Sequence, residues 1–383
     1  MESVFRAGFC CYHELEIGPE PVFEKGELMK FSEYSDAVFQ KELPTITSVV
    51  AKLSKGTVHD YYSNGDYWWP NPDTEDGLPY IRRDGETNPE NFFEHRAILM
   101  DMSNDVIVLY SQYMETHDER CVRRIEAILE SFFLNPETMM NPSLNYAQAI
   151  PGICDGRCIG VIDTAQIVNI PFIILKLHDL GVISEDIFAG VSAWFSELCN
   201  WIFTSKLGRE ELGRPNNHSI AAYLQVASFA LLSPDRDRIH DECAKAFMDV
   251  LLPLQMQEDG GFTDELGRTK PYSYSCFVLD IAVSLAVILS KRHPEVLGET
   301  SNGRSLEKGL RFMLPYVEDK SRWPYRKDVE HFDEFPSRMS FMYYGYKVFG
   351  IGEYEECWKN IPWPKDPLGE VARNTIVKMC DLL

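Results

Sequence analysis

A repeated helical pattern constrains the fold of this chain more than any other feature of its sequence. From about residue 95 onward, amphipathic stretches alternate with loops rich in Gly, Pro, Asn and Asp. Apolar residues recur at three- and four-residue spacing within the stretches, which is typical of helices with one buried face, and alternating strand patterns are rare. The expected helices are 97–116, 119–134, 163–180, 185–206, 218–232, 236–257, 274–292, 304–316 and 337–349.

The short loops between these helices restrict how they can pack. Helices joined in this way pack best as antiparallel hairpins, arranged either as a solenoid or as a closed α/α toroid. No repeat of fixed period is visible, which counts against a regular solenoid. Because no linker long enough to separate two domains is present, we expect one domain over 1–383. Within it we expect an N-terminal helical arm at 1–60, a motif-bearing core at 60–290 and closing helices at 291–383.

The charge of the chain limits its partners. The formal net charge is −22, which argues against nucleic acid and anionic membranes. It also opposes a polyanionic ligand at long range, so an acidic polymer would need a local basic cluster. Basic residues do concentrate near the loops discussed below: Arg82, Arg83, Arg96, Arg157, Arg214, Arg268 and Lys270.

Neither a cofactor nor a metal is expected. Cys154 and Cys158 lie four residues apart, but no second Cys/His pair follows at the spacing of a zinc site. Ten scattered cysteines are more typical of a reducing compartment. The N-terminus lacks the pattern of a signal peptide. We therefore expect a cytoplasmic protein as the sequence stands, or an exported one if a signal has been removed, and the oligomeric state stays open.

Two loops have the side chains of a sugar-binding site. The first carries Tyr67-Trp68-Trp69 and then Arg82-Arg83; flat aromatic faces suit sugar rings, and arginines suit carboxylates. A small hydrophobic cluster that pins a long loop is the alternative. The second loop offers neutral and cationic hydrogen-bond donors with little acidity, which fits a polyhydroxylated anion. Its candidates are Asn145, Tyr146, Gln148 and Arg157.

Two further segments carry candidate catalytic groups. Asn216-Asn217-His218 opens an expected helix, where Asn alone is a common helix cap and a lone His is usually structural. Arg268 precedes Tyr272 and Tyr274, and a tyrosine in such a position is usually a core residue. The functional interpretation depends on the two segments together.

These segments resemble the alginate-lyase superfamily, and most closely polysaccharide lyase family 38, whose members degrade alginate-type and glucuronan-type polyuronates. The resemblance covers Tyr67 to Pro70, Asn141 to Gly152, Gly156 to Thr164, Asn216 to His218 and Arg268 to Tyr274, in family order. It implies an all-α fold, an α/α toroid in the form of an incomplete barrel of antiparallel helical hairpins, without a metal or other cofactor. Relatives often have His beside the catalytic tyrosine, whereas Ser273 and Ser275 flank it here.

The resemblance also implies site residues. It assigns catalysis to Asn217, His218, Arg268 and Tyr274, with Tyr272 as a second candidate phenol. An acidic polysaccharide is the expected partner, and its expected contacts are Tyr67, Trp68, Trp69, Arg82, Arg83, His95, Asn145, Tyr146, Gln148, Arg157, Asn216 and Tyr272.

β-Elimination from a uronate explains why such a set is needed. The C5 proton is a weak acid because the adjacent carboxylate is already negative, so Asn217 and Arg268 would neutralise that carboxylate. A phenol ionises near pH ~10, so we expect Arg268 to lower the pKa of Tyr274. If the C5 proton and O4 lie on one face of the ring, Tyr274 serves as base and acid; if they lie on opposite faces, His218 is the base.

Two other classes of protein remain open. A glycoside hydrolase on the same fold would need paired carboxylates, for which Asp84, Asp163, Asp264 and Glu265 are candidates. A non-catalytic module that binds acidic sugars would use the aromatic loops but would not need His218 with Arg268 and Tyr274. The sequence therefore predicts a polysaccharide lyase and leaves the preferred uronate open.

Overall fold

The computed structural model describes residues 36–43 and 45–361 and consists mainly of helices. The α-helices are α2 (Glu94–Thr116), α3 (Glu119–Leu129), α4 (Ile170–Asp179), α5 (Glu185–Thr204), α6 (Lys206–Leu212), α7 (Asn217–Phe229), α8 (Arg236–Ala246), α9 (Leu252–Gln255), α10 (Thr263–Leu266), α11 (Pro271–Ser290), α12 (Leu306–Glu318), α13 (Ser340–Lys347) and α14 (Glu353–Asn360).

Short 3-10 and π turns complete the helical structure. The 3-10 turns are η1 (Ile46–Ser48), η3 (Cys158–Ile167), η4 (Ala230–Leu232), η6 (Pro294–Leu297), η7 (Lys320–Arg322) and η8 (Phe332–Glu334), and the π turns are η2 (Glu130–Leu134) and η5 (Phe247–Leu251). Four short strands are present: β1 (Tyr62–Asn64), β2 (Trp68–Trp69), β3 (Ile81–Arg82) and β4 (Tyr146–Ala149).

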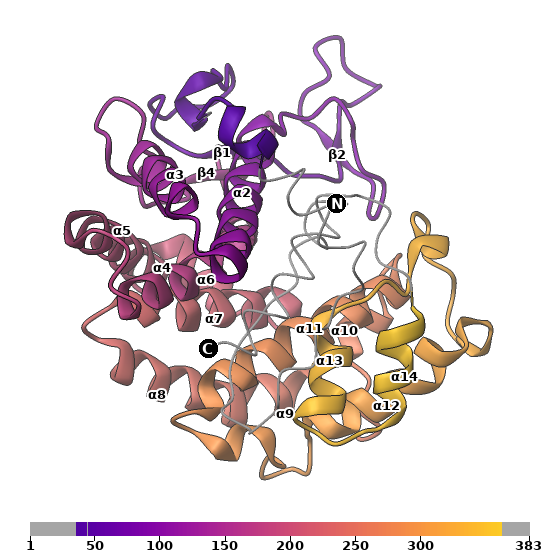
Figure 1. The fold of residues 1–383 in the computed structure, drawn as a ribbon. Coiled ribbons are helices and arrows are strands. Elements are labelled where there is room, and N and C mark those ends of the chain that lie inside the picture. The colour runs from indigo at the N-terminus through magenta and orange to yellow at the C-terminus, as the bar shows by residue number, and fades with distance from the viewer. Residues whose placement is uncertain (1–35, 44, 362–383) are drawn as a thin grey trace.

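Neighbouring helices in the chain pack as hairpins. Helix α2 packs on α3, α5 and α7 pack on each other, α7 packs on α8, and α13 packs on α14. The chain passes around the molecule from α2 and α3, through α7 and α8, to α12–α14 (Figure 1). The fold is the predicted α/α toroid.

Helix α11 lies at the centre of this arrangement. All of its residues are buried, and its largest interface is with α7. A helix that is apolar on every side belongs in a protein core. The stretches Cys158–Asp179 and Pro271–Ser290 have the length and hydropathy of membrane spans, but both lie mostly inside the protein, as core helices do.

Segments distant in the chain cap the buried ends of two helices. The Asp328 carboxylate accepts hydrogen bonds from the backbone N–H groups of Tyr272 (2.8 Å) and Ser273 (2.9 Å), in the first turn of α11. Asp280, within α11, accepts one from the Phe341 N–H at 2.8 Å, in the first turn of α13. These carboxylates satisfy helix N–H groups that have no partner within their own helix.

Several helix boundaries differ from the sequence prediction. The stretch 163–180 is divided into η3 and α4, and 236–257 is interrupted by η5. The stretch 185–206 ends early because Ser205 begins a new helix, α6, where its side chain accepts a hydrogen bond from the Gly208 N–H. Helix α11 begins at Pro271 rather than 274, since proline suits the first helical turn.

The strands gather the aromatic loops at one end of the helices (Figure 1). β1 pairs in parallel with β4, and β2 pairs with β3 antiparallel, with Trp68 opposite Arg82. Alternation in the sequence did not predict these strands because each has only two to four residues. Most of the predicted N-terminal arm, and the chain beyond residue 361, lie outside the described residues.

Candidate functional site

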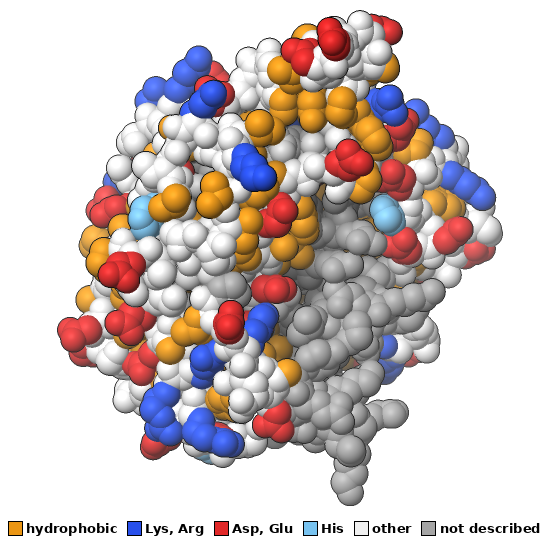
Figure 2. Space-filling model, turned by 90° about the horizontal axis from the view of Figure 1, so that it is seen from above, with side chains coloured by type: hydrophobic (Ala, Val, Ile, Leu, Met, Phe, Trp, Pro, Cys, Tyr) orange, Lys and Arg blue, Asp and Glu red, His pale blue; other side chains and the backbone are white. Residues whose placement is uncertain are grey.

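A cavity of about 300 Å³ lies where the strands meet η3, α7 and α11. Its lining residues come from segments far apart in the chain: Asp66, Tyr67, Trp68, Arg82, Gln148, Arg157, Cys158, Ile159, Ile162, Arg214, Asn216, Asn217, His218, Arg268, Tyr274 and Phe277. In the space-filling view from above, hydrophobic side chains gather in the middle and upper part of this face, and charged side chains lie both among and around them (Figure 2).

The first turn of α7 brings Asn217 and His218 to the cavity. One oxygen of Glu265, Oε1, accepts hydrogen bonds from the Asn217 backbone N–H (2.9 Å) and from its side-chain Nδ2 (2.8 Å). His218 Nδ1 lies 2.6 Å from Oε1 of Glu211. Both glutamates are buried, so each of the two adjacent residues on α7 has a buried carboxylate behind it.

Tyr274 lies in the first turns of α11, with its hydroxyl between two partners. The hydroxyl is 2.8 Å from that of Tyr67 and accepts a hydrogen bond from Arg268 Nη2 at 3.1 Å. The Arg268 guanidinium also lies over the Tyr274 ring, 4.2 Å from its centroid. The same Nη2 donates to Asp84 Oδ1 at 3.1 Å, which fixes the guanidinium in place.

Arg268 lowers the pKa of Tyr274, as expected, but it does not bring that pKa below the ordinary value of a phenol. Burial raises the pKa of the phenol, and the Arg268 cation lowers it only in part, so that the pKa is about 12. Desolvation works against the charge on Arg268, but nearby Tyr274 and Asp84 outweigh it and raise the pKa of the guanidinium. Near neutral pH, Tyr274 is a neutral phenol beside a permanent cation.

Arg157 is held by the side chain and backbone of Gln148. Its Nε donates to the Gln148 carbonyl at 2.8 Å and its Nη2 to Gln148 Oε1 at 3.1 Å. The guanidinium lies 5.7 Å from the ring centroid of Trp68, and Gly65 makes this approach possible because a Cβ there would collide with both side chains. Gln148 has a φ of +50°, which is uncommon for a residue other than glycine.

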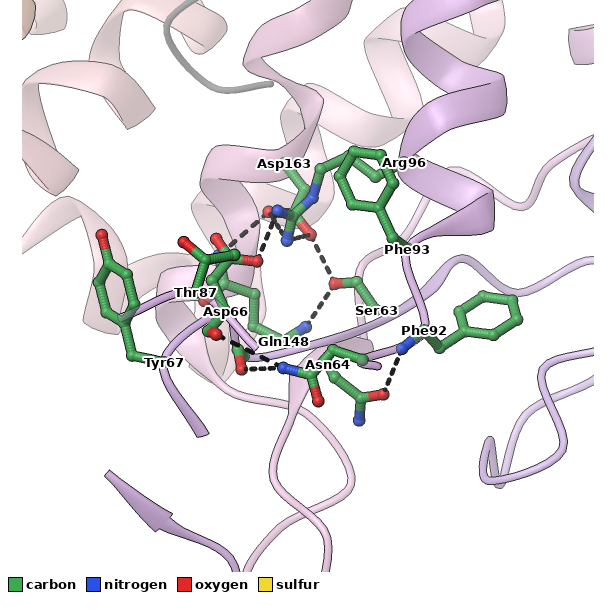
Figure 3. Close-up of polar contacts among 12 residues, drawn as sticks. Ser63, Asn64, Asp66, Tyr67, Thr87, Phe92, Phe93, Arg96, Gln148 and Asp163 are labelled. Atoms are coloured by element: carbon green, nitrogen blue, oxygen red, sulfur yellow. Dashed lines mark hydrogen bonds and ion pairs between the residues drawn. The ribbon is translucent and has the colours of Figure 1, made fainter. Parts of the chain in front are cut away.

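A buried charged network lies behind Gln148 and the aromatic loop (Figure 3). Asp163 accepts hydrogen bonds from Ser63 (2.5 Å), Gln148 Nε2 (3.0 Å) and the Tyr61 hydroxyl (3.1 Å). Arg96 reaches Asp163 through Nη2 (3.1 Å) and Asp66 through Nη1 (2.7 Å). The network therefore fixes the position of Gln148, and through it Arg157.

The cavity lining is basic although the protein is acidic. Four arginines line it, Arg82, Arg157, Arg214 and Arg268, and the one carboxylate in the described lining, Asp66, is paired with Arg96. The net charge of the whole chain is −22. The local cation excess that an acidic ligand requires is therefore present at this site.

The structure brings together ten of the sixteen residues predicted for the site. The four predicted catalytic residues, Asn217, His218, Arg268 and Tyr274, all line the cavity. Six predicted binding residues join them: Tyr67, Trp68, Arg82, Gln148, Arg157 and Asn216.

Two predicted contacts are structural residues instead. Tyr272 is fully buried, and its hydroxyl donates to the Tyr316 carbonyl at 2.8 Å, so it belongs to the core. His95 is also buried: its Nδ1 accepts from the Tyr62 N–H at 3.1 Å and its Nε2 lies 2.9 Å from the Val49 carbonyl. Neither side chain reaches the cavity.

Four others lie outside the cavity on the surrounding loops. Trp69 donates from Nε1 to the Glu86 carbonyl at 3.1 Å, with the Arg83 guanidinium 4.8 Å from its ring centroid. Asn145 is exposed and bonds to Ser143, and Tyr146 is half-buried in β4. These residues do not contact a ligand confined to the cavity.

Sequence reasoning missed Glu211 and the role of Glu265 beside Asn217. With 59 acidic residues in the chain, no local pattern singles these two out. It also missed several lining residues: Cys158, Ile159, Ile162 and Phe277. No group of three or more His, Cys, Asp or Glu residues with the geometry of a metal site occurs in the described part of the chain.

Comparisons with known proteins define the class of this fold and site. The family model described as "Alginate lyase" matches residues 46–323. An alginate lyase from Bacteroides ovatus is 28% identical, with a TM-score of 0.83, and the match covers 92% of each chain. A search of curated proteins finds no match.

More distant structures share the fold. A histidine-to-alanine variant of alginate lyase A1-III in complex with a tetrasaccharide is 12% identical with a TM-score of 0.56, over 89% of this chain and 91% of that one. A tyrosine-to-phenylalanine variant, also with a tetrasaccharide, is 14% identical with a TM-score of 0.54, over 89% of this chain and 92% of that one. The family match and the fold show that this protein is a polysaccharide lyase. The chain belongs to the alginate lyase family.

Proposed function

We propose that this protein cleaves an acidic polysaccharide by β-elimination at a uronate residue, and that this polysaccharide is alginate. Two findings support the substrate class. The cavity has four arginines in its lining, and the structure that matches over 92% of the chain is an alginate lyase. Aromatic Tyr67 and Trp68 provide flat surfaces against which sugar rings can stack.

The convergence of Asn217, His218, Arg268 and Tyr274 on one cavity carries the proposal. In the mechanism we propose, the substrate carboxylate is held by Asn217 and Arg268. The amide of Asn217 keeps a second N–H when the first bonds to Glu265, and Arg268 keeps its charge beside Asp84. Donors fixed in advance stabilise the negative charge that grows on the carboxylate as C5 loses its proton.

The protonation state of Tyr274 suits an acid. A phenol with a pKa of about 12 holds its proton near neutral pH and can give it to O4 as the glycosidic bond breaks. His218 accepts the C5 proton when that proton lies on the opposite face from O4. When both lie on one face, Tyr274 acts as base and acid, and must first lose its own proton.

A two-carboxylate hydrolase is disfavoured by the same cavity. Of the candidates for such a mechanism, Asp163 is buried in the network with Arg96, and Glu265 is bonded to Asn217. Asp84 bonds to Arg268 behind the cavity, and Asp264 is exposed on α10. None of the four belongs to the described lining of the cavity.

Digestion of defined polymers tests the proposal. Polymannuronate, polyguluronate, glucuronan and a neutral glucan would be incubated with the protein in the presence of EDTA. A lyase produces ultraviolet absorbance from a C4–C5 double bond on at least one polyuronate and none on the neutral glucan. Reducing sugar without that absorbance would indicate a hydrolase, and binding without any product would indicate a sugar-binding module.

A further inference from the structure

Glu211 is an unusual residue in its position. It lies at the C-terminal end of α6, one residue before Leu212, and is fully buried. A helix C-terminus carries partial negative charge, so a carboxylate there is unfavourable, and burial adds a desolvation cost. Its second oxygen, Oε2, has no hydrogen-bond partner among the residues that the structure describes. Stability alone gives no reason for this carboxylate.

Among the described residues, the carboxylate of Glu211 has one hydrogen-bond partner, His218. The loop between α6 and α7 returns the chain so that Glu211 Oε1 lies 2.6 Å from His218 Nδ1, seven residues further on. Because a carboxylate only accepts hydrogen bonds, Nδ1 must carry a proton in this contact. The other ring nitrogen, Nε2, is then the unprotonated atom of the neutral imidazole.

His218 is the member of this pair that lines the cavity. The His218 side chain is 15% exposed and lines the cavity, whereas Glu211 is screened behind it. No residue in the described part of the chain bonds to Nε2. The imidazole therefore presents a lone pair to the substrate, with an anion on its far side that stabilises the ring after it takes a proton.

We infer that Glu211 is a positioning residue for the elimination reaction: it holds His218 in the Nδ1–H tautomer and aims Nε2 into the cavity as the proton acceptor. This inference rests on the proposed function. It deepens that function by adding a residue that acts on the substrate only through His218. Glu265 has the corresponding contact with Asn217, but to an amide, whose tautomer cannot change.

The substitution Glu211→Gln tests the inference. It keeps the size of the side chain and removes the negative charge that fixes the tautomer. On a polyuronate whose C5 proton and O4 lie on opposite faces, we expect kcat to fall by about 10²-fold, within the range of a positioned base, with KM nearly unchanged. Because a buried, poorly paired carboxylate is lost, the melting temperature should stay the same or rise.

Glu210→Gln is the matched control. Glu210 is the preceding residue of the same helix, is exposed, and pairs with Lys206 at 3.8 Å. The same charge is removed without a contact to His218, so activity should remain at the wild-type level. A Glu211→Gln protein with wild-type kcat, or one whose lost activity is fully accounted for by lost folding, would overturn the inference.

The tautomer of His218 can be measured directly by NMR. In ¹⁵N spectra of histidine-labelled protein, at a pH where the imidazole is neutral, we expect His218 as the Nδ1–H form, assigned with His218→Asn. In Glu211→Ala this preference should disappear. An Nε2–H form in the wild-type protein would contradict the inference.

Failure of the proposed function gives a different result. If no unsaturated product forms on any polyuronate, or if His218→Ala keeps full activity, the assignment of His218 as the base fails. If His218→Ala is inactive and Glu211→Gln is fully active, only the role of Glu211 fails.

Discussion

The Asp163 network and the first turn of α7 both bury carboxylates beside the cavity, but the two regions stabilise them differently. Asp163 is fully buried, with both oxygens hydrogen-bonded and the charge of Arg96 next to it. Glu211 and Glu265 are equally buried, and each has one oxygen without a partner among the described residues. In the part of the chain that the structure describes, their bonded oxygens have hydrogen bonds only with His218 and Asn217.

The difference separates stabilisation from catalysis. A buried ion pair whose carboxylate oxygens are both hydrogen-bonded is costly to break, because the remaining charge loses its partner. A buried carboxylate that is only half satisfied is tolerated where it orients a reacting group. Substitutions in the Asp163 network should therefore change the free energy of unfolding, and those around α7 and α11 should change the rate.

The largest effect is expected at the reacting hydroxyl. Tyr274→Phe removes only the phenol oxygen, so kcat should fall by about 10²–10⁴-fold, as for loss of a positioned acid. The melting temperature and KM should change little. Steady-state kinetics and thermal melting measure this. A protein that melts normally and turns over at the wild-type rate would show that Tyr274 is not the acid.

Breaking the buried ion pair should be the largest effect on stability. Asp163→Asn leaves Arg96 with Asp66 alone and introduces an amide where several donors converge. We expect a loss of about 3–5 kcal/mol in the free energy of unfolding, measured by urea denaturation. The exposed Asp264→Asn is the control and should change it by less than about 0.5 kcal/mol. If Asp163→Asn lowers the free energy of unfolding only slightly, the two regions do not differ in the way described.

The neighbouring tyrosine on α11 should behave as a core residue. Tyr272→Phe leaves the Tyr316 carbonyl without its hydrogen bond, so we expect a loss of about 1–3 kcal/mol in unfolding free energy. The kcat per folded molecule should stay at the wild-type value, in contrast to Tyr274→Phe. A large fall in kcat with normal stability would show that Tyr272 acts in the site and is not only a core residue.

The smallest expected effect is the change with pH in the stability contributed by Glu265. Burial raises the pKa of Glu265, and its hydrogen bonds to Asn217 lower it only in part. A raised folded pKa means that the ionised form is penalised in the folded state. The penalty is absent below the unfolded pKa, about 4.3, and grows as pH rises through the folded pKa. Glu265→Gln should therefore stabilise the protein at pH 7, by on the order of 1 kcal/mol, and have little effect near pH 4.

The pH dependence of the stability contributed by Asp66 should have the opposite sign to that of Glu265. Burial raises the pKa of its carboxyl, but the Arg96 cation and its hydrogen bond outweigh burial, and the pKa is lowered. This group contributes stability above its unfolded pKa, and the contribution is lost as pH falls. Asp66→Asn should destabilise the protein at pH 7 and less so in acid, as measured by melting at both pH values. The same sign for Asp66 and Glu265 would contradict the distinction between the regions.

Periodicity predicted the helices, and the family resemblance predicted the toroid and the four cavity residues, because both have local signals. Helical periodicity extends over 14 or more residues, and Asn217-His218 and Arg268 to Tyr274 are short motifs in family order. Tyr272 stayed a second candidate beside Tyr274, because the orientation of both side chains depends on where α11 begins. Proline suits the start at Pro271, but the cap on that start comes from Asp328, which lies more than fifty residues away in the chain.

The burial of the glutamates could not be predicted from the sequence, for another reason. Glu211 follows a run of charged residues, Arg209 and Glu210, which reads as an exposed helix face. Its burial depends on the turn that returns the chain to His218, and that turn is a tertiary feature. Similarly, Gln148 was recognised by its chemistry, whereas its positive φ and its bond to Asp163 depend on the pairing of β1 with β4.

The cap that Asp328 provides has a practical consequence for anyone shortening this gene. The family match ends at residue 323, which would be a natural place to truncate an expressed fragment. Such a fragment would lack Asp328, and also Glu330, whose carboxylate accepts a hydrogen bond from Lys270 at 2.7 Å. The helix that carries Tyr274 would then begin with two uncapped amides, so the minimal active fragment has to extend past the family boundary.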